Sequence, residues 1–460
     1  MNRFAVVTEV PADLRRARVY EFGWQSWSPT GVYPASARSP RPPQAWRQTS
    51  GYRPGRPAPP AGFQGEGLLA VQADPDAPVH LVALPDHGGA VPTIRAEATG
   101  DRLLVSADGP VEVTVDPGPG GLYGALSRFA DRYAVRAGVG QIRPCPPAWA
   151  SWYHYFTEFT HADLVENLRA MDDLALPIEV VRVDDAFQAG IGDWLELSDG
   201  FDSLPGFVGR IRDTGRRAGL WIAPLLVGAE SRLFHDHPDW VVRAPDGSPL
   251  VALHNWGQDC FPLDVTHPAA AAYLRTVLET WVAHGASYLM VDFMFAGALD
   301  GRRHRADVDG LQAYRDGLRL IRDAIGPETY LQGCGAPMFP SVGLVDSMRV
   351  GPDVALDWEP AGGDMSRPGL APAAATSIGR AFTQGRFWVN DADCLIVRPE
   401  IPRRREWAAV VAAVSGARIS SDRLTALDGP GVELTRELLS GATDRPFVGQ
   451  SVTGQLLTHP

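Results

Sequence analysis

Hydrophobic and polar residues follow two different patterns along the chain. Up to about residue 143, short apolar runs are separated by Gly, Pro and Asp, as in Val79–Leu84, Thr93–Ala98, Arg102–Ala107 and Val111–Val115. Runs of this length and spacing predict an antiparallel β-sandwich domain over residues 1–143. Apolar positions at three- and four-residue steps in Leu122–Val135 predict a helix that closes this domain.

From about Pro146 onward, short apolar runs alternate with longer helical patterns, which is typical of βαβ units around a parallel sheet. Helices are expected at His161–Met171, His267–His284 and Asp307–Ile325. The expected strands are Trp149–Tyr153, Ile178–Val183, Leu220–Ala223, Tyr288–Val291, Tyr330–Gln332, Ser347–Val350, Phe387–Asn390 and Arg418–Ser420.

Eight strands alternating with helices predict an α/β fold, a (β/α)8 TIM barrel over residues 144–427. A doubly wound sheet is less favoured, because no GxGxxG motif follows an early strand. Residues 428–460 are expected to supply the last barrel helix, Gly431–Leu439, and a short C-terminal tail.

Composition excludes several classes of protein. The formal net charge is −12, which disfavours a nucleic-acid or anionic-membrane partner. The four cysteines (Cys145, Cys260, Cys334 and Cys394) form no CxxC pair, and the N-terminus has no apolar segment typical of a secretion signal. We therefore expect a reduced, cytoplasmic protein.

Acidic residues follow the ends of several expected strands, where barrel enzymes place their active sites. They are Asp184, Asp185, Asp193, Asp292, Asp353 and Asp393. Any one of them could instead cap a helix, and for a single Asp the two interpretations are about even; the cap is favoured for Asp264. Several strand ends that carry acids are harder to explain by capping alone.

A barrel mouth with many carboxylates suits either metal-dependent chemistry or acid–base chemistry on a sugar. The single HxH motif, His235–His237, lies away from the strand ends and is interpreted as structural. Sugar chemistry fits better, because aromatic faces pack on sugar rings and Trp152, Trp194 and Trp221 lie near strand ends. For each of these tryptophans, burial in the core is the alternative. No metal or organic cofactor is implied.

The chain resembles the α-galactosidases of glycoside hydrolase family 36, the melibiase-like enzymes of clan D. The resemblance rests on seven strings in order: GWQSWSPTG (23–31), WASWYHYF (149–156), VDDAFQAGIGDWLE (183–196), GLWIAPLLVGAESRLFHDHPDW (219–240), YLMVDFMFAGAL (288–299), GCGAPMFPSVGLVDSMRVGPD (333–353) and FWVNDADCLIVR (387–398).

The resemblance implies a retaining exo-glycosidase that releases terminal α-linked galactose from small oligosaccharides. It implies Asp292 as the nucleophile and Asp353 as the acid/base, their carboxylates facing each other across one cavity about 5–5.5 Å apart. It also implies that Asp184, Asp185 and Arg349 bind sugar hydroxyls and that Cys334 lines the pocket. We expect Arg349 to face the sugar, and burial beside Asp292 to raise the pKa of Asp353.

The chain departs from the family at several positions. Met290 stands where the family usually has a Lys, and Ala186 where it usually has a Gly. A sibling activity such as α-N-acetylgalactosaminidase, a transglycosidase, or a catalytically silent sugar-binding relative therefore stays open. Trp24 and Trp27 either help to close the sugar pocket or pack between the domains, and packing is slightly favoured. The family often assembles, so a homo-oligomer is possible.

Overall fold

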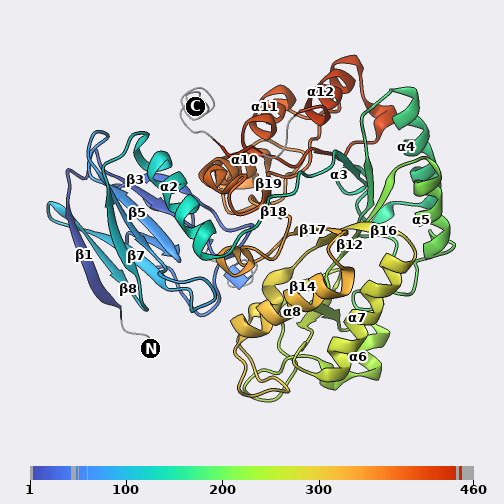
Figure 1. Cartoon of the computed structure of the whole chain (residues 1–460), viewed down its shortest axis with the longest axis horizontal. Helices are drawn as coiled ribbons and strands as arrows, with labels where there is room; N and C mark the ends of the chain where they lie inside the picture. Colours follow the sequence, from blue (N-terminus) through green and yellow to red (C-terminus); the bar gives the residue numbers. More distant parts are fainter. Residues whose placement is uncertain (1–3, 43–47, 50, 60, 442–444, 448–460) are drawn as a thin grey trace.

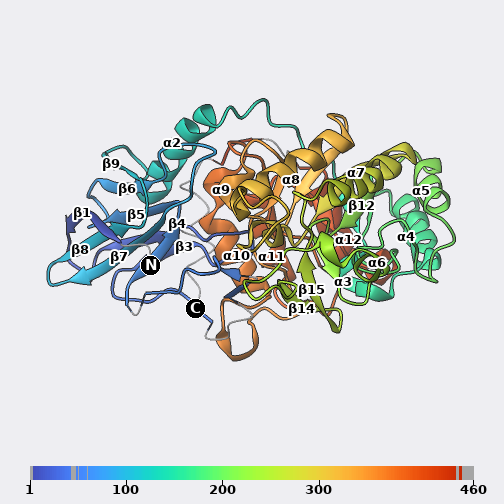
Figure 2. The same ribbon diagram turned by 90° about the horizontal axis from the view of Figure 1, so that it is seen from below.

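The computed structural model of the chain describes residues 4–42, 48–49, 51–59, 61–441 and 445–447. Most of the expected C-terminal tail lies outside the described residues. Two bodies lie side by side, antiparallel sheets on one side and a curled parallel sheet with helices around it on the other (Figures 1 and 2). Helix α2 (Gly121–Arg136) packs on the antiparallel strands and also contacts the short helix Ala381–Thr383 of the second body.

The N-terminal strands form two antiparallel sheets. One has the order β1 (Ala5–Pro11), β8 (Arg102–Ala107), β7 (Thr93–Thr99) and β4 (Phe63–Glu66). The other has the order β3 (Gly31–Pro34), β2 (Arg18–Glu21), β5 (Leu68–Gln72), β6 (Val79–Ala83) and β9 (Glu112–Asp116).

The central strand β5 of the five-stranded sheet is buried on both faces. On β5, Leu69 and Val71 belong to the core between the two sheets, whereas Leu68 and Ala70 belong to the core shared with α2 and the barrel. This division follows the two-residue period of a strand. The expected antiparallel sandwich is therefore confirmed.

The second body is built on eight parallel strands. Their order is β19 (Val389–Asp391), β18 (Ser347–Arg349), β17 (Tyr330–Gly333), β16 (Ala286–Val291), β12 (Arg217–Ile222), β11 (Val180–Val183), β10 (Ala148–Ala150) and β20 (Ile419–Ser420). A parallel bridge between Leu395, just after β19, and Ser420 of β20 connects the two ends of the sheet. The expected (β/α)8 barrel is confirmed.

The helices follow the strands in the expected alternation. They are α3 (Trp152–Tyr155), α4 (His161–Asp173), α5 (Leu204–Asp213), α6 (Arg232–Asp236), α7 (Pro268–Ala283), α8 (Gly310–Ile325), α9 (Met338–Ser341), α10 (Leu370–Gly379), α11 (Arg404–Val414) and α12 (Gly429–Leu439). Strands β13 (Leu226–Gly228), β14 (Leu253–Asn255) and β15 (Gln258–Pro262) form a small antiparallel sheet inserted between β12 and α7.

The first barrel strand is shorter than expected. The expected strand Trp149–Tyr153 ends at Ala150, because Ser151 takes a helical conformation and α3 begins at Trp152. Residues 139–147 carry no helix or strand between α2 and β10, and we propose the domain boundary in this segment. In the part of the chain that is described, no helix combines the length and apolarity of a membrane span.

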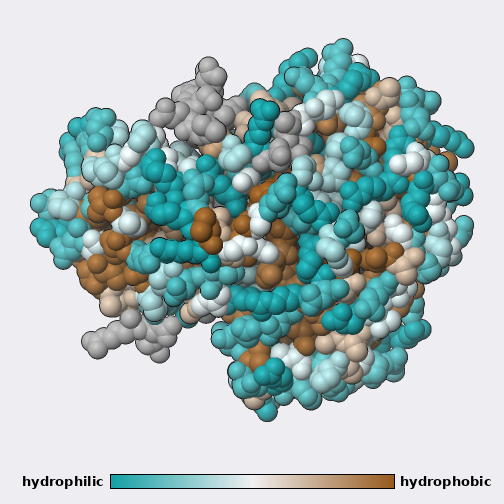
Figure 3. Space-filling view, in the orientation of Figure 1, coloured by the Kyte–Doolittle hydropathy of each residue, from teal (hydrophilic) through white to brown (hydrophobic). Residues whose placement is uncertain are grey.

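Aromatic side chains connect the two bodies. Phe339 of α9 contacts Phe22 from the N-terminal part (ring centroids 4.9 Å apart), Tyr133 of α2 (5.2 Å) and Phe387 of the barrel (6.3 Å). The outer surface is mostly hydrophilic in the view of Figure 3, with apolar side chains gathered over the N-terminal strands. The interface between the bodies is thus a continuation of the hydrophobic core.

Phe339→Ala removes the ring that these three aromatic residues share. We expect it to lower the free energy of unfolding by about 3–5 kcal/mol, because buried aromatic rings leave large cavities. Leu195→Ala is the control: Leu195 is 43% exposed, and its truncation should cost less than about 0.5 kcal/mol. Urea unfolding followed by tryptophan fluorescence measures both changes, and equal midpoints would contradict a shared core.

Candidate active site

A cavity of about 370 Å³ opens at the carboxyl ends of the barrel strands. It is lined by Trp152, Tyr153, Phe156, Thr157, Arg182, Asp184, Asp185, Trp221, Asn255, Trp256, Met290, Asp292, Phe293, Arg349, Asp353 and Asp393. Its acidic side chains lie within four residues of the carboxyl ends of β11, β16, β18 and β19, and the curled parallel sheet brings these strand ends to one mouth. The cavity collects eight of the eleven site residues that the sequence predicts.

Asp292 lies at the end of β16 and is almost fully buried. Its carboxylate accepts hydrogen bonds from the indole N–H of Trp221 (3.2 Å) and the backbone N–H of Phe293 (2.7 Å). Burial raises its pKa to about 6, and the negative charge of Asp353 adds to the rise. Asp292 is therefore mostly ionised at neutral pH, and it lines the same cavity as Asp353.

Asp353 is held by a shared guanidinium. Arg349 donates from one nitrogen to Asp353 Oδ1 (2.9 Å), and the same nitrogen lies 2.8 Å from Asp393 Oδ2. The Asp353 side chain keeps 41% of its surface exposed, whereas the side chains of Arg349 and Asp393 are almost fully buried. Burial of the carboxyl in the cavity wall and the charge of Asp393 raise the pKa of Asp353 against the opposing effect of Arg349.

Two details of Asp353 differ from the expectation. Arg349 contacts Asp353 directly, so the prediction that it would turn away toward the sugar is wrong for this structure. The physical reason is Asp393, whose buried carboxylate holds the same guanidinium nitrogen that donates to Asp353. The rise in the pKa of Asp353 has the expected direction, but the neighbouring charge that causes it is mainly Asp393.

Two adjacent carboxylates follow β11. Asp184 accepts hydrogen bonds from Arg182, with both donor nitrogens 3.0 Å away, and its backbone N–H donates to the Ser151 hydroxyl. Asp185 accepts from the indole N–H of Trp256 at 2.6 Å. Burial raises the pKa of Asp185 to about 6, and the charges of Asp184 and Asp292 contribute. These two side chains place carboxylate acceptors side by side in the lining of the cavity.

Three predicted site residues do not line the cavity. Cys334 is fully buried, and its thiol contacts the Asp292 carboxylate from the core side. Trp194 is buried and packs edge-on against Trp221, with ring centroids 6.1 Å apart. Asp193 accepts from the backbone N–H groups of Arg232 and Leu233, both at 2.9 Å, and so supports the start of α6. The structure does not bring Asp193 to the site.

Arg182 and Trp256 line the cavity but were missed from the sequence. Arg182 is one of the two arginines in the lining, and it lies two residues before Asp184, so both side chains point to the same face by the two-residue period of a strand. An arginine inside a buried strand is the signal that could have revealed it. Trp256 lies in the turn of the β14–β15 hairpin, which is distant in sequence from the end of any barrel strand, so no strand pattern pointed to it.

A second cavity, of about 750 Å³, adjoins the first and shares Asn255, Phe293 and Asp353 with it. Trp27 from the N-terminal part forms one wall, and its ring packs edge-on against Phe293 at 5.2 Å and Phe295 at 6.0 Å. Trp27 therefore packs between the two bodies and also lines this second cavity. Asp353 lies where the two cavities meet.

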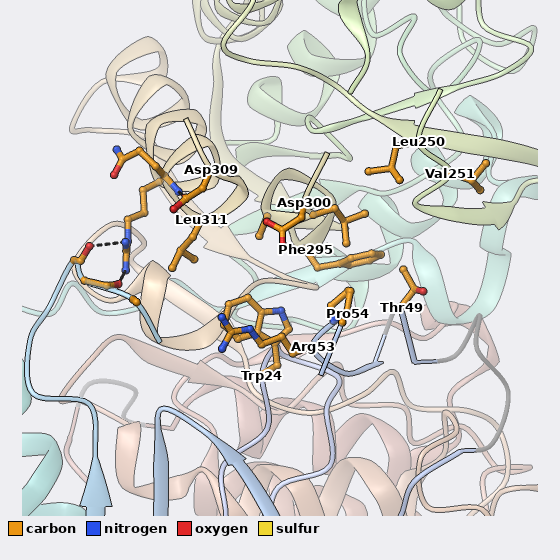
Figure 4. Close-up of a pocket in the computed structure, with 18 residues that line it drawn as sticks. Trp24, Thr49, Arg53, Pro54, Leu250, Val251, Phe295, Asp300, Asp309 and Leu311 are labelled. Atoms are coloured by element: carbon orange, nitrogen blue, oxygen red, sulfur yellow. Dashed lines mark hydrogen bonds between the residues drawn. The ribbon is translucent and has the colours of Figure 1, made fainter. Parts of the chain in front are cut away.

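A third cavity, of about 550 Å³, shares no lining residue with the acidic cavity. Figure 4 shows Trp24 and Arg53 at one wall, with Phe295 and Asp300 opposite. The Arg53 guanidinium lies 4.7 Å from the Trp24 ring centroid, so this tryptophan is covered by a cation and packs between the bodies as expected. The HxH motif is also structural: His237 stacks on Trp240, with ring centroids 3.8 Å apart.

Several of the curated relatives that match the chain are α-galactosidases, and one is an alpha-1,4-glucan:maltose-1-phosphate maltosyltransferase of Arcanobacterium haemolyticum. The family model described as "Melibiase" matches residues 146–294. Over 139 residues the chain is 27% identical to α-galactosidase AgaA of Geobacillus stearothermophilus, and over 151 residues it is 29% identical to the probable α-galactosidase C of Aspergillus flavus. These segments are 27% and 29% of this chain but only 18% and 20% of the two curated relatives.

Solved structures match over nearly the whole chain. The α-galactosidase TtGalA of Thermus thermophilus, in complex with stachyose, matches with a TM-score of 0.79 and 29% identity, over 95% of this chain and 93% of its own. The structure of AgaA has the same fold at a TM-score of 0.65, with 15% identity over 94% of this chain and 61% of its own. The chain thus matches the melibiase family model over residues 146–294, and over nearly its whole length it is similar to a solved α-galactosidase.

Proposed function

We propose that the protein hydrolyses terminal α-linked galactose from small oligosaccharides with retention of configuration. The observation that carries this proposal is the pair Asp292 and Asp353, two carboxyls of unequal environment on the wall of one cavity. Two such groups are what double displacement at a sugar carbon requires. The 29% identity to TtGalA across the barrel supports the choice of an α-galactoside.

In the proposed reaction the Asp292 carboxylate attacks the anomeric carbon while Asp353 gives its proton to the leaving oxygen. Water then attacks the glycosyl-enzyme, and Asp353 removes its proton. Formation of the ester removes the charge of Asp292, and this change helps Asp353 to act as the base in the second step. Arg349 stabilises the ionised form of Asp353 at that stage, because it donates directly to that carboxylate.

We propose that Asp184 and Asp185 accept hydrogen bonds from the galactose hydroxyls. Arg182 pairs with Asp184, and hydrogen bonds to a charged carboxylate contribute roughly 1.5–3 kcal/mol each. Met290 on the cavity wall donates no hydrogen bond, and Arg182 is a nearby cation that also lines the cavity. Trp152 and Trp221 offer apolar faces to the sugar ring.

The adjoining cavity supports a leaving group of appreciable size. It opens on the side of Asp353, the proposed proton donor, and its volume of about 750 Å³ exceeds that of the acidic cavity. A leaving group must lie next to the acid that protonates it. Both observations favour oligosaccharides such as those of the raffinose series over galactosides of small alcohols.

The alternative functions are not favoured, since all but one of the curated relatives and solved structures reported above are α-galactosidases. We keep the cytoplasm as the proposed location, because all four cysteines are buried free thiols. The oligomeric state stays a prediction of the resemblance.

Asp292→Ala removes the proposed nucleophile. We expect kcat on p-nitrophenyl α-galactoside to fall by several orders of magnitude, and added azide to restore turnover with β-galactosyl azide as the product. Nuclear magnetic resonance of the product gives the configuration. An α-configured azide, or activity that survives the substitution, would rule out attack by Asp292.

Asp193→Asn is the matched control for Asp292→Ala, because the Asp193 carboxylate lies near the site residues in sequence but not in space. We expect kcat/KM within about twofold of the wild type and a loss of about 1 kcal/mol in unfolding free energy, because Asp193 supports the first turn of α6. A large loss of activity without a loss of stability would instead place Asp193 in the site.

The pH dependence follows from the raised pKa of Asp292. Because the nucleophile must be ionised, we expect kcat/KM to fall about tenfold per pH unit below pH about 6. In Asp353→Asn, assayed on α-galactosyl fluoride, whose departure needs little acid assistance, the acidic limb should move to lower pH, because the charge that raises the pKa of Asp292 is gone. An acidic limb that does not move would show that the two groups do not interact.

A further inference from the structure

A buried arginine outside the acidic cavity and the adjoining second cavity connects the N-terminal part to the barrel. Arg380 directly follows α10, and its side chain is completely buried. Among the described residues no carboxylate lies within ion-pair distance of it. Burial lowers its pKa to about 9, which still leaves the guanidinium charged at neutral pH.

The two terminal nitrogens of Arg380 donate to backbone carbonyl groups, whereas its Nε has no hydrogen-bond partner among the described residues. One terminal nitrogen donates to the carbonyls of Gln25 (2.8 Å), Ser28 (3.0 Å) and Gly23 (3.4 Å). The other donates to Ser26 O and to Val350 O (3.0 Å). Four of the five acceptors belong to the loop of residues 23–28, and the fifth follows Arg349 at the end of β18.

A buried cation is costly unless it donates to nearby acceptors, so the five hydrogen bonds from the terminal nitrogens fix the loop as firmly as they fix the arginine. The planar guanidinium reaches carbonyls in several directions from one plane, which an ammonium group does not reproduce. The loop is also tied to the segment after β17, because Ala336 N–H donates to the Ser26 hydroxyl and Met338 N–H donates to Trp24 O.

Trp27 belongs to the loop of residues 23–28 that Arg380 holds. Its ring packs on Phe293 and Phe295 and lies so close to Gly335 that a Cβ there would come within 3.0 Å of the indole. Trp27 is the N-terminal wall of the cavity that begins at Asp353. A shift of the loop would therefore move this wall relative to the proposed proton donor.

We propose that Arg380 is a positioning residue for the leaving group: it clamps residues 23–28 to the end of β18 and so fixes Trp27 as the wall against which the leaving sugar binds. This inference rests on the proposed function and deepens it. Arg380 touches no substrate and acts through the loop. Its removal should affect substrates according to the size of their leaving group.

The test compares two substrates that share the galactosyl group. Raffinose has a disaccharide leaving group, whereas α-galactosyl fluoride has a single atom and needs no wall. We expect Arg380→Lys to lower kcat/KM for raffinose about tenfold or more, mainly through KM, and to leave the value for the fluoride within about twofold. Arg380→Met, which removes the buried charge rather than misplacing it, is the second variant and should show the same selectivity.

Arg418→Lys is the matched control, because Arg418 is also buried and also donates to backbone carbonyls, those of Val411 and Ala412, away from both cavities. It should lower thermal stability without changing the ratio of the two activities. Trp27→Ala should reproduce the loss on raffinose, and Arg380→Met should add little to it in the double variant.

The outcomes separate the two levels of the argument. Equal losses on both substrates in the Arg380 variants, or independent and additive effects of Trp27 and Arg380, overturn the positioning role while leaving the proposed activity standing. A wild-type protein that hydrolyses neither substrate overturns the proposed function, and the positioning role fails with it.

Discussion

The constraint on which the site depends is the burial of several carboxylates within one barrel mouth. Mutual repulsion and loss of hydration would drive these groups to take up protons unless cations balance some of them. Two buried arginines do this: Arg182 pairs with Asp184, and Arg349 is shared by Asp353 and Asp393. Asp292 and Asp185 have no such partner among the described residues, and burial raises the pKa of each to about 6. Arg349 thus opposes the rise in the pKa of Asp353, and among the described residues no such ion pair opposes the rise at Asp292 or Asp185.

Backbone strain accompanies this arrangement of charge. Phe293, directly after Asp292, has a φ of 52°, and Asp393 has a φ of 93°, both in the region that favours glycine. Each is held by hydrogen bonds: the Phe293 N–H donates to Asp292, and the Asp393 carboxylate accepts from the N–H groups of Val354 and Cys394. The packing around the site overrides the local preference of the chain, as is common at functional sites.

The architecture was predictable from the sequence because each strand and helix is indicated by the pattern of residues within it. Each barrel strand is a short apolar run, and an acid placed directly after it is carried to the mouth by the parallel sheet itself. The start of α4 at His161 was likewise predictable, since Thr160 and Asp163 form a capping box. Asp292, Asp353 and Asp184 therefore lie where strand counting puts them.

What escaped prediction depends on contacts between distant segments. Trp256 reaches Asp185 from a hairpin inserted after β12, and its surrounding sequence is polar, so nothing local distinguishes it from a surface residue. The direction of Arg349 is decided by Asp393, which follows the neighbouring strand β19 and meets Arg349 only because β18 and β19 pair in the sheet. Asp193 was placed in the site by its position after β11, but nearby amide groups of α6 compete for its carboxylate.

The carbonyl cage around Arg380 also bears on how such proteins can be recombined. A barrel grafted onto a foreign N-terminal module, or expressed without one, would lose four of the five acceptors that hold this cation. The guanidinium would then lie in an apolar interior, where only water could replace the lost hydrogen-bond acceptors. The two bodies therefore need to be transferred together. Chimeras that keep residues 23–28 together with the end of α10 preserve these hydrogen bonds, and chimeras that separate the two segments lose them.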